Sequence, residues 1–431
     1  MNMNVDVILG LQWGDEGKGK IVDAIADNYN AIARFQGGPN AGHTIEFDGN
    51  KFILHTIPSG IFHRNITNVI GNGVVLDPFI FMKEIEKVQS AGYDPHNNLI
   101  ISDKANLILP GHRLLDAVCE AALGNRKIGS TLKGIGPAYT EKYQRKGFRT
   151  GDIFYDEFEA RYKLHREEQL KRAKEIHSSF ADVQIDGLPF EEYEEKWMHA
   201  LDQLREFKIE STEILLNRML QEGKKILAEG AQGSLLDVDF GSYPFVTSSN
   251  TTTGGVCTGL GVPPSSIGKV FGIFKAYCTR VGNGPFPTEL HDHMGEELRK
   301  NGHEFGSTTG RPRRCGWLDL PALRYTIMIN GVTDLVMTKA DVLDSLETIE
   351  VANTYKSQNH EFMLPEFRLG MSFQPTYLSM KGWQTDITQI TEKSDLPEAF
   401  LHYFNFIQKE LNSKISYVSV GPGRKQIIKT N

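Results

Sequence analysis

Short apolar runs alternate with amphipathic segments along the first 110 residues of the chain. Residues 5–9 and 31–35 are mainly apolar runs, typical of strands that are buried on both faces. The segment at about 18–28, between these runs, is compatible with a helix. A strand, a helix and a second strand in this order favour parallel pairing, because a parallel connection needs a long crossover. The pattern therefore predicts an α/β fold.

Turn and cap signals predict further elements. Residues 46–52 surround the dipeptide Asp48-Gly49, which is a strong hairpin signal. Residues 78–91 are expected to form a helix with Asp77 as its N-cap. In residues 155–222, many charges and apolar residues at helical spacing predict two or three surface helices. Short strands are predicted at 69–71, 99–101, 226–229, 270–277, 335–337 and 415–419.

Composition places the chain among enzymes rather than nucleic-acid or membrane proteins. With 431 residues, 40% of them hydrophobic, we expect a single domain over 1–431 with a charged helical elaboration inserted at about 155–222. The net charge of −7 argues against non-specific nucleic-acid binding as a main function. Four cysteines without a C-x-x-C pair indicate free, mostly buried thiols in a reducing compartment. The N-terminus has no signal-peptide pattern and no apolar stretch is long enough for a membrane span, so a cytoplasmic protein is expected.

Glycines, acids and lysines follow the first predicted strand at residues 14–20. Small residues let backbone N–H groups close on phosphate oxygens, while a lysine and the start of the next helix add positive charge. The segment departs from the usual phosphate loop: Gln12 replaces a glycine, and Gly19 replaces the hydroxyl that holds Mg²⁺. Asp15 can supply a metal ligand and a proton acceptor instead. The alternative is a glycine-rich turn with solvated acids.

A second glycine-rich loop follows the second predicted strand at residues 36–44. Ligands of doubly wound sheets bind beyond the carboxyl ends of the strands, so the two loops are expected to be neighbours. His43 lies among glycines rather than on an apolar face. A lone histidine is more often structural or solvent-facing, but its place beside a phosphate loop favours a catalytic role.

The segment Thr338-Lys339-Ala340-Asp341 follows an apolar run and has the form T-K-x-D. An aspartate carboxylate can accept hydrogen bonds from N1–H and the 2-amino group of guanine, which adenine does not offer in that geometry. The lysine stem can pack along the base. A strand-to-helix cap is the alternative, but a phosphate loop in the same chain favours guanine specificity.

Hydroxyls and arginines surround a glycine at residues 306–314. Hydroxyl and N–H groups suit one carboxylate of a small anionic ligand, and guanidinium groups suit a second carboxylate or a phosphate. A basic surface patch or an RNA contact is the alternative, which the acidic net charge disfavours. Weaker candidates in segments rich in Gly, Ser and Thr are Ser130, Thr131, Arg145, Gln232 and Thr247.

Taken in order along the chain, these motifs closely resemble those of the adenylosuccinate synthetase family. The similar segments span nearly the whole chain: 12–20, 40–44, 134–139, 229–233, 243–250, 279–282, 309–314, 338–341 and 419–422. The resemblance implies a P-loop-like GTP-binding α/β fold, with a large, mostly parallel central sheet flanked by helices and elaborated by further helices and loops. It also implies GTP-dependent ligation of L-aspartate to IMP, giving adenylosuccinate, GDP and phosphate in the first committed step from IMP to AMP.

The resemblance implies roles for particular residues. Asp15 would remove the N1 proton of IMP, whose O6 then attacks the γ-phosphate of GTP, and His43 would assist as GDP leaves. Aspartate would then displace phosphate from 6-phosphoryl-IMP. Mg²⁺ would be held by Asp15 and the backbone carbonyl of Gly42. The residues implied in catalysis are Asp15, Lys18, His43 and Gln232.

The resemblance further implies three binding sites and a homodimer in which Arg145 reaches the IMP of the partner subunit. The implied GTP site is Gly14, Asp15, Glu16, Gly17, Lys18, Gly19, Lys20, Gly42, His43, Thr44, Arg313, Lys339, Ala340, Asp341, Ser419, Val420 and Gly421. The implied IMP site is Asp15, Glu16, Gly17, Lys18, Asn40, Ala41, Gly42, His43, Thr131, Arg145, Gln232, Thr247 and Arg311. The implied aspartate site is Ser307, Thr308, Thr309, Gly310, Arg311, Pro312 and Arg313.

One departure and two alternatives stand beside this reading. Leu132 and Lys133 occupy positions where the family commonly has glycine and arginine, and lysine loses the bidentate fork. A related phage branch that acts on dGMP typically lacks the catalytic aspartate, so Asp15 favours the IMP enzyme. The alternatives are a regulatory GTPase, whose GTP turnover needs neither IMP nor aspartate, and an RNA-binding GTPase that uses residues 311–314.

Overall fold

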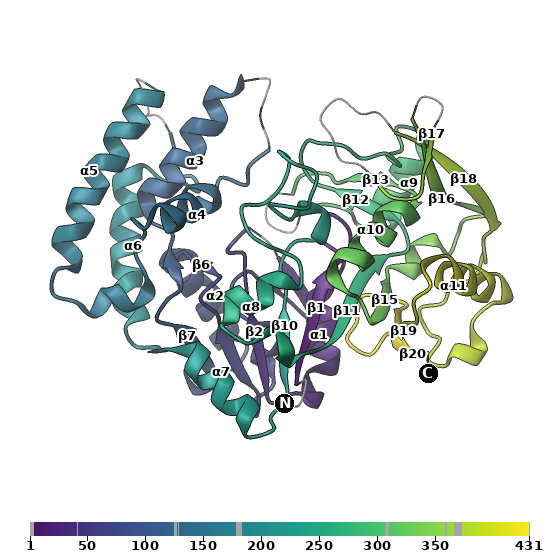
Figure 1. Cartoon of the computed structure of the whole chain (residues 1–431), viewed down its shortest axis with the longest axis horizontal. Helices are drawn as coiled ribbons and strands as arrows, with labels where there is room; N and C mark the ends of the chain where they lie inside the picture. Colours follow the sequence, from purple (N-terminus) through teal and green to yellow (C-terminus); the bar gives the residue numbers. More distant parts are fainter. Residues whose placement is uncertain are drawn as a thin grey trace.

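The computed structural model of the chain describes residues 4–40, 42–124, 127, 129–177, 183–306, 310–357, 360–365 and 373–430. A ten-stranded sheet runs through the middle of the molecule in the order β20-β19-β15-β11-β1-β10-β2-β5-β7-β9 (Figure 1). Neighbouring strands are parallel except β19 and β20. The strands are β1 (Val5–Gly10), β2 (Ala31–Arg34), β5 (Thr67–Ile70), β7 (Leu99–Ser102), β9 (Lys208–Glu210), β10 (Ile226–Glu229), β11 (Ile267–Lys275), β15 (Asp334–Thr338), β19 (Ile415–Ser419) and β20 (Ile427–Lys429).

Helices flank the central sheet, and additional helices and a separate small sheet lie beyond its two ends (Figure 1). Helices α3 to α6 gather at one end, and the small sheet that contains β16 to β18 lies at the other. The helices are α1 (Lys18–Ile25), α2 (Pro78–Ser90), α3 (Pro110–Ala122), α4 (Ile135–Gln144), α5 (Phe158–Ile176), α6 (Phe190–Leu204), α7 (Thr212–Gln221), α8 (Gly254–Leu260), α9 (His293–Asn301), α10 (Leu320–Asn330) and α11 (Glu398–Leu411). The smaller sheets consist of β3 (His43–Phe47) with β4 (Asn50–Leu54), β6 (Val75–Leu76) with β8 (Asn106–Leu107), β12 (Cys278–Arg280) with β13 (Arg314–Gly316), and β14 (Leu318–Asp319), β16 (Thr348–Ser357), β17 (His360–Phe362) and β18 (Gln374–Lys381).

Strand β1 is buried on both faces, which explains its apolar run. Val5, Val7 and Leu9 pack into a core on one face, and Ile8 packs with Ile21 of α1 into another core. Period-two alternation of side chains sends successive residues to opposite faces, so both sets need to be apolar. The strand order and the parallel pairs confirm the large, mostly parallel, helix-flanked sheet that was expected from the sequence.

Local signals located several elements correctly. The hairpin β3–β4 turns at Asp48 and Gly49, which both have positive φ, as an Asn-Gly or Asp-Gly turn requires. Asp77 caps α2, because its Oδ1 accepts hydrogen bonds from the amides of Phe79 and Ile80 at 3.0 and 3.3 Å. Strand β19 covers the predicted residues 415–419.

The order of the strands departs from the simplest expectation. Strands β1 and β2 are parallel, as the strand–helix–strand pattern predicts, but β10 from the second half of the chain lies between them. Glu229 at the end of β10 is in register with Ile8 of β1 and Arg34 of β2. This insertion brings the loop after β10 between the loops that follow β1 and β2.

Residues 155–222 contain three helices, α5, α6 and α7, within the predicted range. The apolar residues of α6 form one buried face along the helix, as the prediction of amphipathic surface helices requires. Tyr193 and Trp197 are fully buried in a core shared with α2 and α3, and Trp197 donates a hydrogen bond to the carbonyl of Ile108 at 2.9 Å. This segment therefore contributes to the hydrophobic core as well as to the charged surface.

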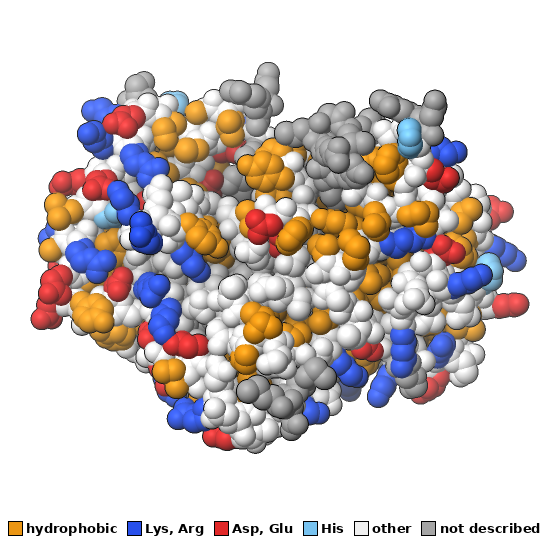
Figure 2. Space-filling view, viewed as in Figure 1, with side chains coloured by type: hydrophobic (Ala, Val, Ile, Leu, Met, Phe, Trp, Pro, Cys, Tyr) orange, Lys and Arg blue, Asp and Glu red, His pale blue; other side chains and the backbone are white. Residues whose placement is uncertain are grey.

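The surface carries mixed charge. Figure 2 shows acidic and basic side chains intermixed on the face in view rather than gathered in one basic patch. Among the helices of the described ranges, none is both long enough and apolar enough to cross a bilayer. All four cysteines are free; Cys278 and Cys315 are buried, but Cys119 is exposed, so the expectation of mostly buried thiols fails for Cys119.

Candidate active site

The loop after β1, residues 11–17, lies where the parallel strands end. Gly17 precedes α1 with φ of 82°, a left-handed conformation that a residue with a side chain adopts only under strain. Thr338 at the end of β15 donates a hydrogen bond to the carbonyl of Glu16 at 2.8 Å. The loops after β1 and β15 are therefore in direct contact, as expected for ligand loops at one edge of a parallel sheet.

Glu16 faces into its own loop. Its carboxylate is fully buried and accepts hydrogen bonds from the amides of Gly14 and Gln12 at 2.8 and 3.2 Å. Lys18 Nζ lies 2.5 Å from the other carboxylate oxygen. The side chain of Glu16 therefore stabilises the conformation of its own loop. Only the backbone of Glu16 is available to contact a ligand.

The two lysines of the loop join it to different neighbours. Lys18 Nζ donates to the carbonyl of Gln232, in the loop after β10. Lys20 Nζ donates to Ser419 Oγ at 2.7 Å and to the carbonyl of Gly421, in the loop after β19. Burial lowers the pKa of Lys20 to about 7, against the opposing charge of Asp341. The lysines therefore hold the loops after β10 and β19 against the phosphate-type loop.

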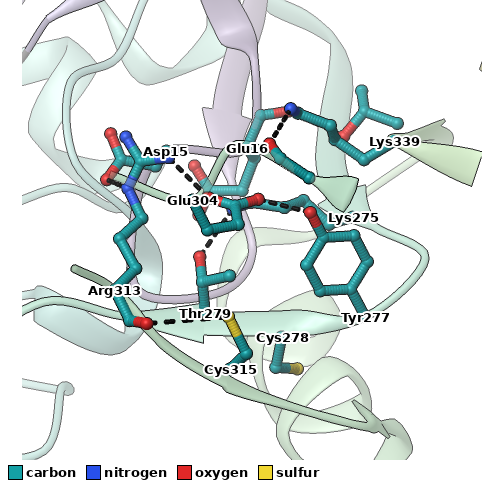
Figure 3. A network of polar contacts seen from close by, with 12 residues as sticks. Asp15, Glu16, Lys275, Tyr277, Cys278, Thr279, Glu304, Arg313, Cys315 and Lys339 are labelled. Carbon is teal, nitrogen blue, oxygen red and sulfur yellow. Dashed lines mark hydrogen bonds and ion pairs between the residues drawn. The ribbon is translucent and has the colours of Figure 1, made fainter. Parts of the chain in front are cut away.

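Asp15 lies at the open end of a network of buried charges (Figure 3). Its Oδ2 is 2.8 Å from Arg313 Nε, and Arg313 NH1 also bonds to the buried carboxylate of Glu304. Glu304 accepts further hydrogen bonds from Lys275 Nζ at 2.9 Å and from the hydroxyl of Tyr277. Asp15 itself remains 28% exposed, so its carboxylate is accessible from the open edge of the sheet.

Each charged group in this network favours the ionised form of its oppositely charged neighbours. Burial opposes ionisation of Glu304, but the positive charges of Lys275, Lys339 and Arg313 outweigh it and hold the pKa of Glu304 at about 2. Burial lowers the pKa of Lys275, and Glu304 partly opposes that shift. Sequence reasoning missed Lys275 and Glu304. A lysine at the end of the apolar run that forms β11 was the available signal, since a charged residue is rarely buried without a partner.

His43 begins β3 and is held by the end of β10. Its Nδ1 lies 2.5 Å from Glu229 Oε1, and both side chains are buried. Within the part of the chain that the structure describes, His43 Nε2 is buried and has no hydrogen-bond partner. Burial, together with the charge of Arg34, lowers the pKa of His43 to about 4. A side chain at Gly19 would come within 2.8 Å of His43 Cβ, so glycine there permits the close approach of α1.

Gln232 joins the loops after β10 and β2. Its Nε2 donates to Asn40 Oδ1 at 2.9 Å, while its Oε1 is buried and lacks a partner among the described side and main chains. Gln232 also has a positive φ of 56°. The structure thus brings these two predicted IMP residues together beside Lys18; Ala41 lies outside the described residues.

The T-K-x-D segment ends β15 next to Lys20. Lys339 has φ of 59° and donates from Nζ to the carbonyl of Gly302 at 2.8 Å. Asp341 Oδ1 is buried and has no partner in the described ranges, and burial raises the pKa of this carboxyl. A buried acceptor without a partner costs free energy, which a ligand that supplies N–H donors would recover. The positive charges of Lys339 and Lys20 oppose this rise in the pKa of Asp341, so both lysines lie near the carboxylate.

Thr131 and Arg311 line a shared cavity of about 300 Å³. Of the two unusual residues after Thr131, Lys133 bonds to Asp186 Oδ1 at 2.7 Å, and Leu132 is partly exposed. Arg113 pairs with the same Asp186 at 2.8 Å. Lys133 is therefore paired with a carboxylate.

The remaining predicted residues are less enclosed. Arg145 is exposed at the C-terminal end of α4, and Thr247 is partly buried in the loop before α8. Gly42 and Thr44 flank His43, and Gly310 and Pro312 are exposed close to Arg313. Three predicted aspartate residues, Ser307, Thr308 and Thr309, lie outside the described residues.

A second cluster with metal-ligand side chains lies away from this edge. His112 and His165 each place Nε2 within 2.7 Å of Glu141 Oε2. His112 Nδ1 accepts the amide hydrogen of Leu109 at 3.0 Å, so Nε2 carries the ring proton and donates it to Glu141. The protonated Nε2 of His112 has no lone pair for a metal, and the contacts of both histidines with Glu141 join α3, α4 and α5.

Comparisons with known proteins agree along the whole chain. A family model described as adenylosuccinate synthetase matches residues 7–428. The adenylosuccinate synthetase of Christiangramia forsetii is 54% identical over 427 residues, covering 99% of this chain and 100% of the relative. That of Parabacteroides distasonis is 53% identical over 426 residues, covering 99% of each.

Solved structures are similar as well. The fully ligated adenylosuccinate synthetase of Plasmodium falciparum has a TM-score of 0.89 at 38% identity, covering 99% of this chain and 100% of that one. A cyanophage S-2L succinoaminodeoxyadenylate synthetase bound to dGMP and dATP has a TM-score of 0.62 at 21% identity, covering 100% and 96%. At that identity the phage protein is a relative in fold alone.

Proposed function

Because the chain belongs to the adenylosuccinate synthetase family and catalyses the GTP-dependent ligation of L-aspartate to IMP in AMP synthesis, we propose a role for each part of the open edge of the sheet. The proposal is supported by buried polar atoms at this edge that lack a partner in the described chain: His43 Nε2, Gln232 Oε1 and Asp341 Oδ1. Buried polar atoms are nearly always satisfied, so three such atoms at one edge favour a polar ligand that completes them.

Asp15 is the proposed base, and Asp15 with the carbonyl of Gly42 is the proposed Mg²⁺ site. Hard oxygen ligands of this kind suit Mg²⁺, and the Asp15 carboxylate is 28% exposed. When bound, Mg²⁺ would neutralise charge on the transferred phosphate. Arg313 Nε lies 2.8 Å from Asp15 Oδ2, so the guanidinium balances the negative charge of this acid.

The proposed chemistry has two steps at one carbon of the purine. Asp15 accepts the N1 proton of IMP, and the O6 oxygen attacks the γ-phosphorus of GTP as the bond to GDP breaks. His43 and Lys18 stabilise the leaving GDP and the transferred group, and Gln232 positions the base. The amino group of aspartate then displaces phosphate from 6-phosphoryl-IMP and gives adenylosuccinate.

The proposed GTP site extends from the phosphate-type loop to Asp341 and the loop after β19. Asp341→Asn is expected to raise the KM for GTP by about 10–100-fold and to lower the preference for GTP over ATP, because a charged acceptor for the guanine N–H donors is lost. Steady-state kinetics with each nucleotide measures this preference. Asp386→Asn is the matched control, since Asp386 lies close enough to influence Asp341 but is exposed. An unchanged preference in Asp341→Asn would exclude guanine recognition by this residue.

We propose that IMP lies between the phosphate-type loop and the cavity that Thr131 and Arg311 line, with aspartate near residues 307–313. The cavity is polar on one side, where Arg113 and Lys133 pair with Asp186. Thr131 and Arg311 also line this cavity and are the proposed contacts of the IMP phosphate. The pairing of Lys133 explains how this chain tolerates lysine in place of the family's arginine.

We also propose a homodimer in which Arg145 completes the IMP site of the partner. Arg145 is exposed beside Tyr143, whose side chain is 72% exposed on a helix end. Mixing equal amounts of inactive Arg145→Leu and Asp15→Asn subunits should restore roughly a quarter of wild-type activity, because about half of the dimers are mixed and one of the two sites in each mixed dimer is intact. The kcat of the mixture measures this restoration, and a mixture as inactive as its components would contradict shared sites.

Two further proposals concern the domain organisation and the cellular location of the protein. We propose that the chain works as one domain, because the helices of residues 155–222 share a core with α2 and α3. We also propose that the protein acts in the cytoplasm, a reducing compartment in which its four cysteines stay free.

The experiment that tests the function is phosphate release by the purified protein with Mg²⁺ and GTP, with IMP and L-aspartate added or withheld. Release and adenylosuccinate absorbance that require both additions are expected. GTP hydrolysis that is indifferent to IMP and aspartate would instead support the regulatory GTPase.

A further inference from the structure

We infer that Glu229 is a positioning residue, which holds the His43 ring so that Nε2 and not Nδ1 faces the reacting phosphates. The inference rests on the proposed role of His43 and extends it to a residue at the end of another strand. Glu229 closes β10, which lies between β1 and β2, so its side chain starts from the edge where the ligand loops meet.

Four groups surround the Glu229 carboxylate, and all of them are buried. Oε1 lies 2.5 Å from His43 Nδ1 and accepts the hydroxyl of Ser59 at 2.6 Å. Oε2 accepts the amide of Ser59 at 2.8 Å. Arg34 NH1 is farther away, at 4.0 Å from Oε1. The contact with His43 is thus much closer than the contact with the charge of Arg34.

The hydrogen bonds determine which ring nitrogen carries the proton. Because the carboxylate accepts from Ser59 at both oxygens, the proton in the bond to His43 lies on Nδ1. Nε2, the nitrogen that is buried and unpartnered in the described chain, is then the one that can take up a second proton and donate it to a phosphate oxygen. The hydrogen-bond partner of one imidazole nitrogen determines which of the two nitrogens carries the ring proton, as in histidine sites where an acid orients the ring.

A purely structural reading of Glu229 explains less. An acid at the end of a buried strand costs free energy unless it is paired, and an apolar residue would serve the sheet alone. Pairing with Arg34 accounts for the charge of Glu229 but leaves the short contact with His43 unexplained. Positioning of the ring accounts for the distance, the burial and the unpartnered Nε2 together.

The test is a double-mutant cycle of Glu229→Gln and His43→Asn in the full-length enzyme. Glu229→Gln is expected to lower kcat by about 10–100-fold, the usual effect of removing the acid behind a functional histidine, with small changes in the KM for GTP and IMP. In the His43→Asn background, Glu229→Gln is expected to have little further effect, because Glu229 acts through the ring. Losses that multiply would assign Glu229 a structural role and overturn the inference.

A spectroscopic measurement separates this inference from the proposed function. The ¹⁵N chemical shifts of the His43 ring should place the proton on Nδ1 in the wild type and should change in Glu229→Gln. If His43→Asn retained normal kcat, the catalytic role of His43 would fail while the ring measurement still tested the positioning. Ring shifts that are the same in wild type and Glu229→Gln would overturn the positioning itself.

Two further variants control for damage to the fold. Ser59→Ala removes a hydrogen bond from the same carboxylate but keeps the bond to His43, so it should retain most of the kcat. If Glu229→Gln does not fold, Glu229→Asp replaces it in the cycle. Aspartate keeps the charge near Arg34 but draws the carboxylate back from the ring, and it should show the same dependence on His43.

Discussion

Asp15→Asn is expected to lower kcat by at least about 10²–10⁴-fold, the range for loss of a general base. Asparagine fills the same space but cannot accept the N1 proton of IMP, and its neutral oxygen is a weaker ligand for a divalent ion. The requirement for Mg²⁺ should therefore shift to higher concentration as kcat falls. The fold should persist, because Arg313 keeps its bond to Glu304 when the charge of Asp15 is removed.

The measurement is steady-state formation of adenylosuccinate over a series of Mg²⁺ concentrations. Asp156→Asn provides the matched control, since it makes the same chemical change at an exposed position far along the chain. Near-normal kcat in Asp15→Asn would exclude Asp15 as the base. A normal kcat reached only at high Mg²⁺ would leave Asp15 as a metal ligand alone.

His43→Asn is expected to lower kcat by about 10²–10³-fold, the effect of removing one donor that stabilises charge in the transition state. The buried Nε2 of His43 has no partner among the described residues, and the ring lies against Glu229 at the end of β10. Asparagine can still bond to Glu229, but it does not reach as far as the imidazole ring. The KM values for GTP and IMP should change only modestly.

Separate kcat and KM values for each substrate decide this prediction. His291→Asn is a suitable control because His291 is 81% exposed. A higher KM with unchanged kcat would make His43 a binding residue, since uniform binding alters KM alone.

The sequence was informative wherever short-range chemistry decides the structure. The apolar run of β1, the cap at Asp77 and the turn at Asp48-Gly49 act over a few neighbouring residues, so each was recognisable before any tertiary contact was known. The same holds for the loops around Asp15, His43 and Asp341. Their residue types at fixed spacing after strands indicated phosphate and guanine chemistry.

Long-range pairing was not recognisable in this way. No local signal placed β10 between β1 and β2, although this order brings Gln232 to Lys18 and Glu229 to His43. Strand order depends on which apolar faces are buried against one another across the whole chain. The helical spacing of residues 190–204 predicted a helix, but only packing against α2 and α3 buried Trp197.

By itself, then, the sequence determined the class of fold, most of the short elements and the family's chemistry, because backbone propensity and motif spacing are local properties. The tertiary structure alone decided what the charged side chains do. It turned Glu16 into its own loop, joined Lys275 to Glu304 and set Glu229 behind His43. The physical reason is that a buried charge must find its partner through space, and that partner is set by the register of distant strands rather than by its neighbours in sequence.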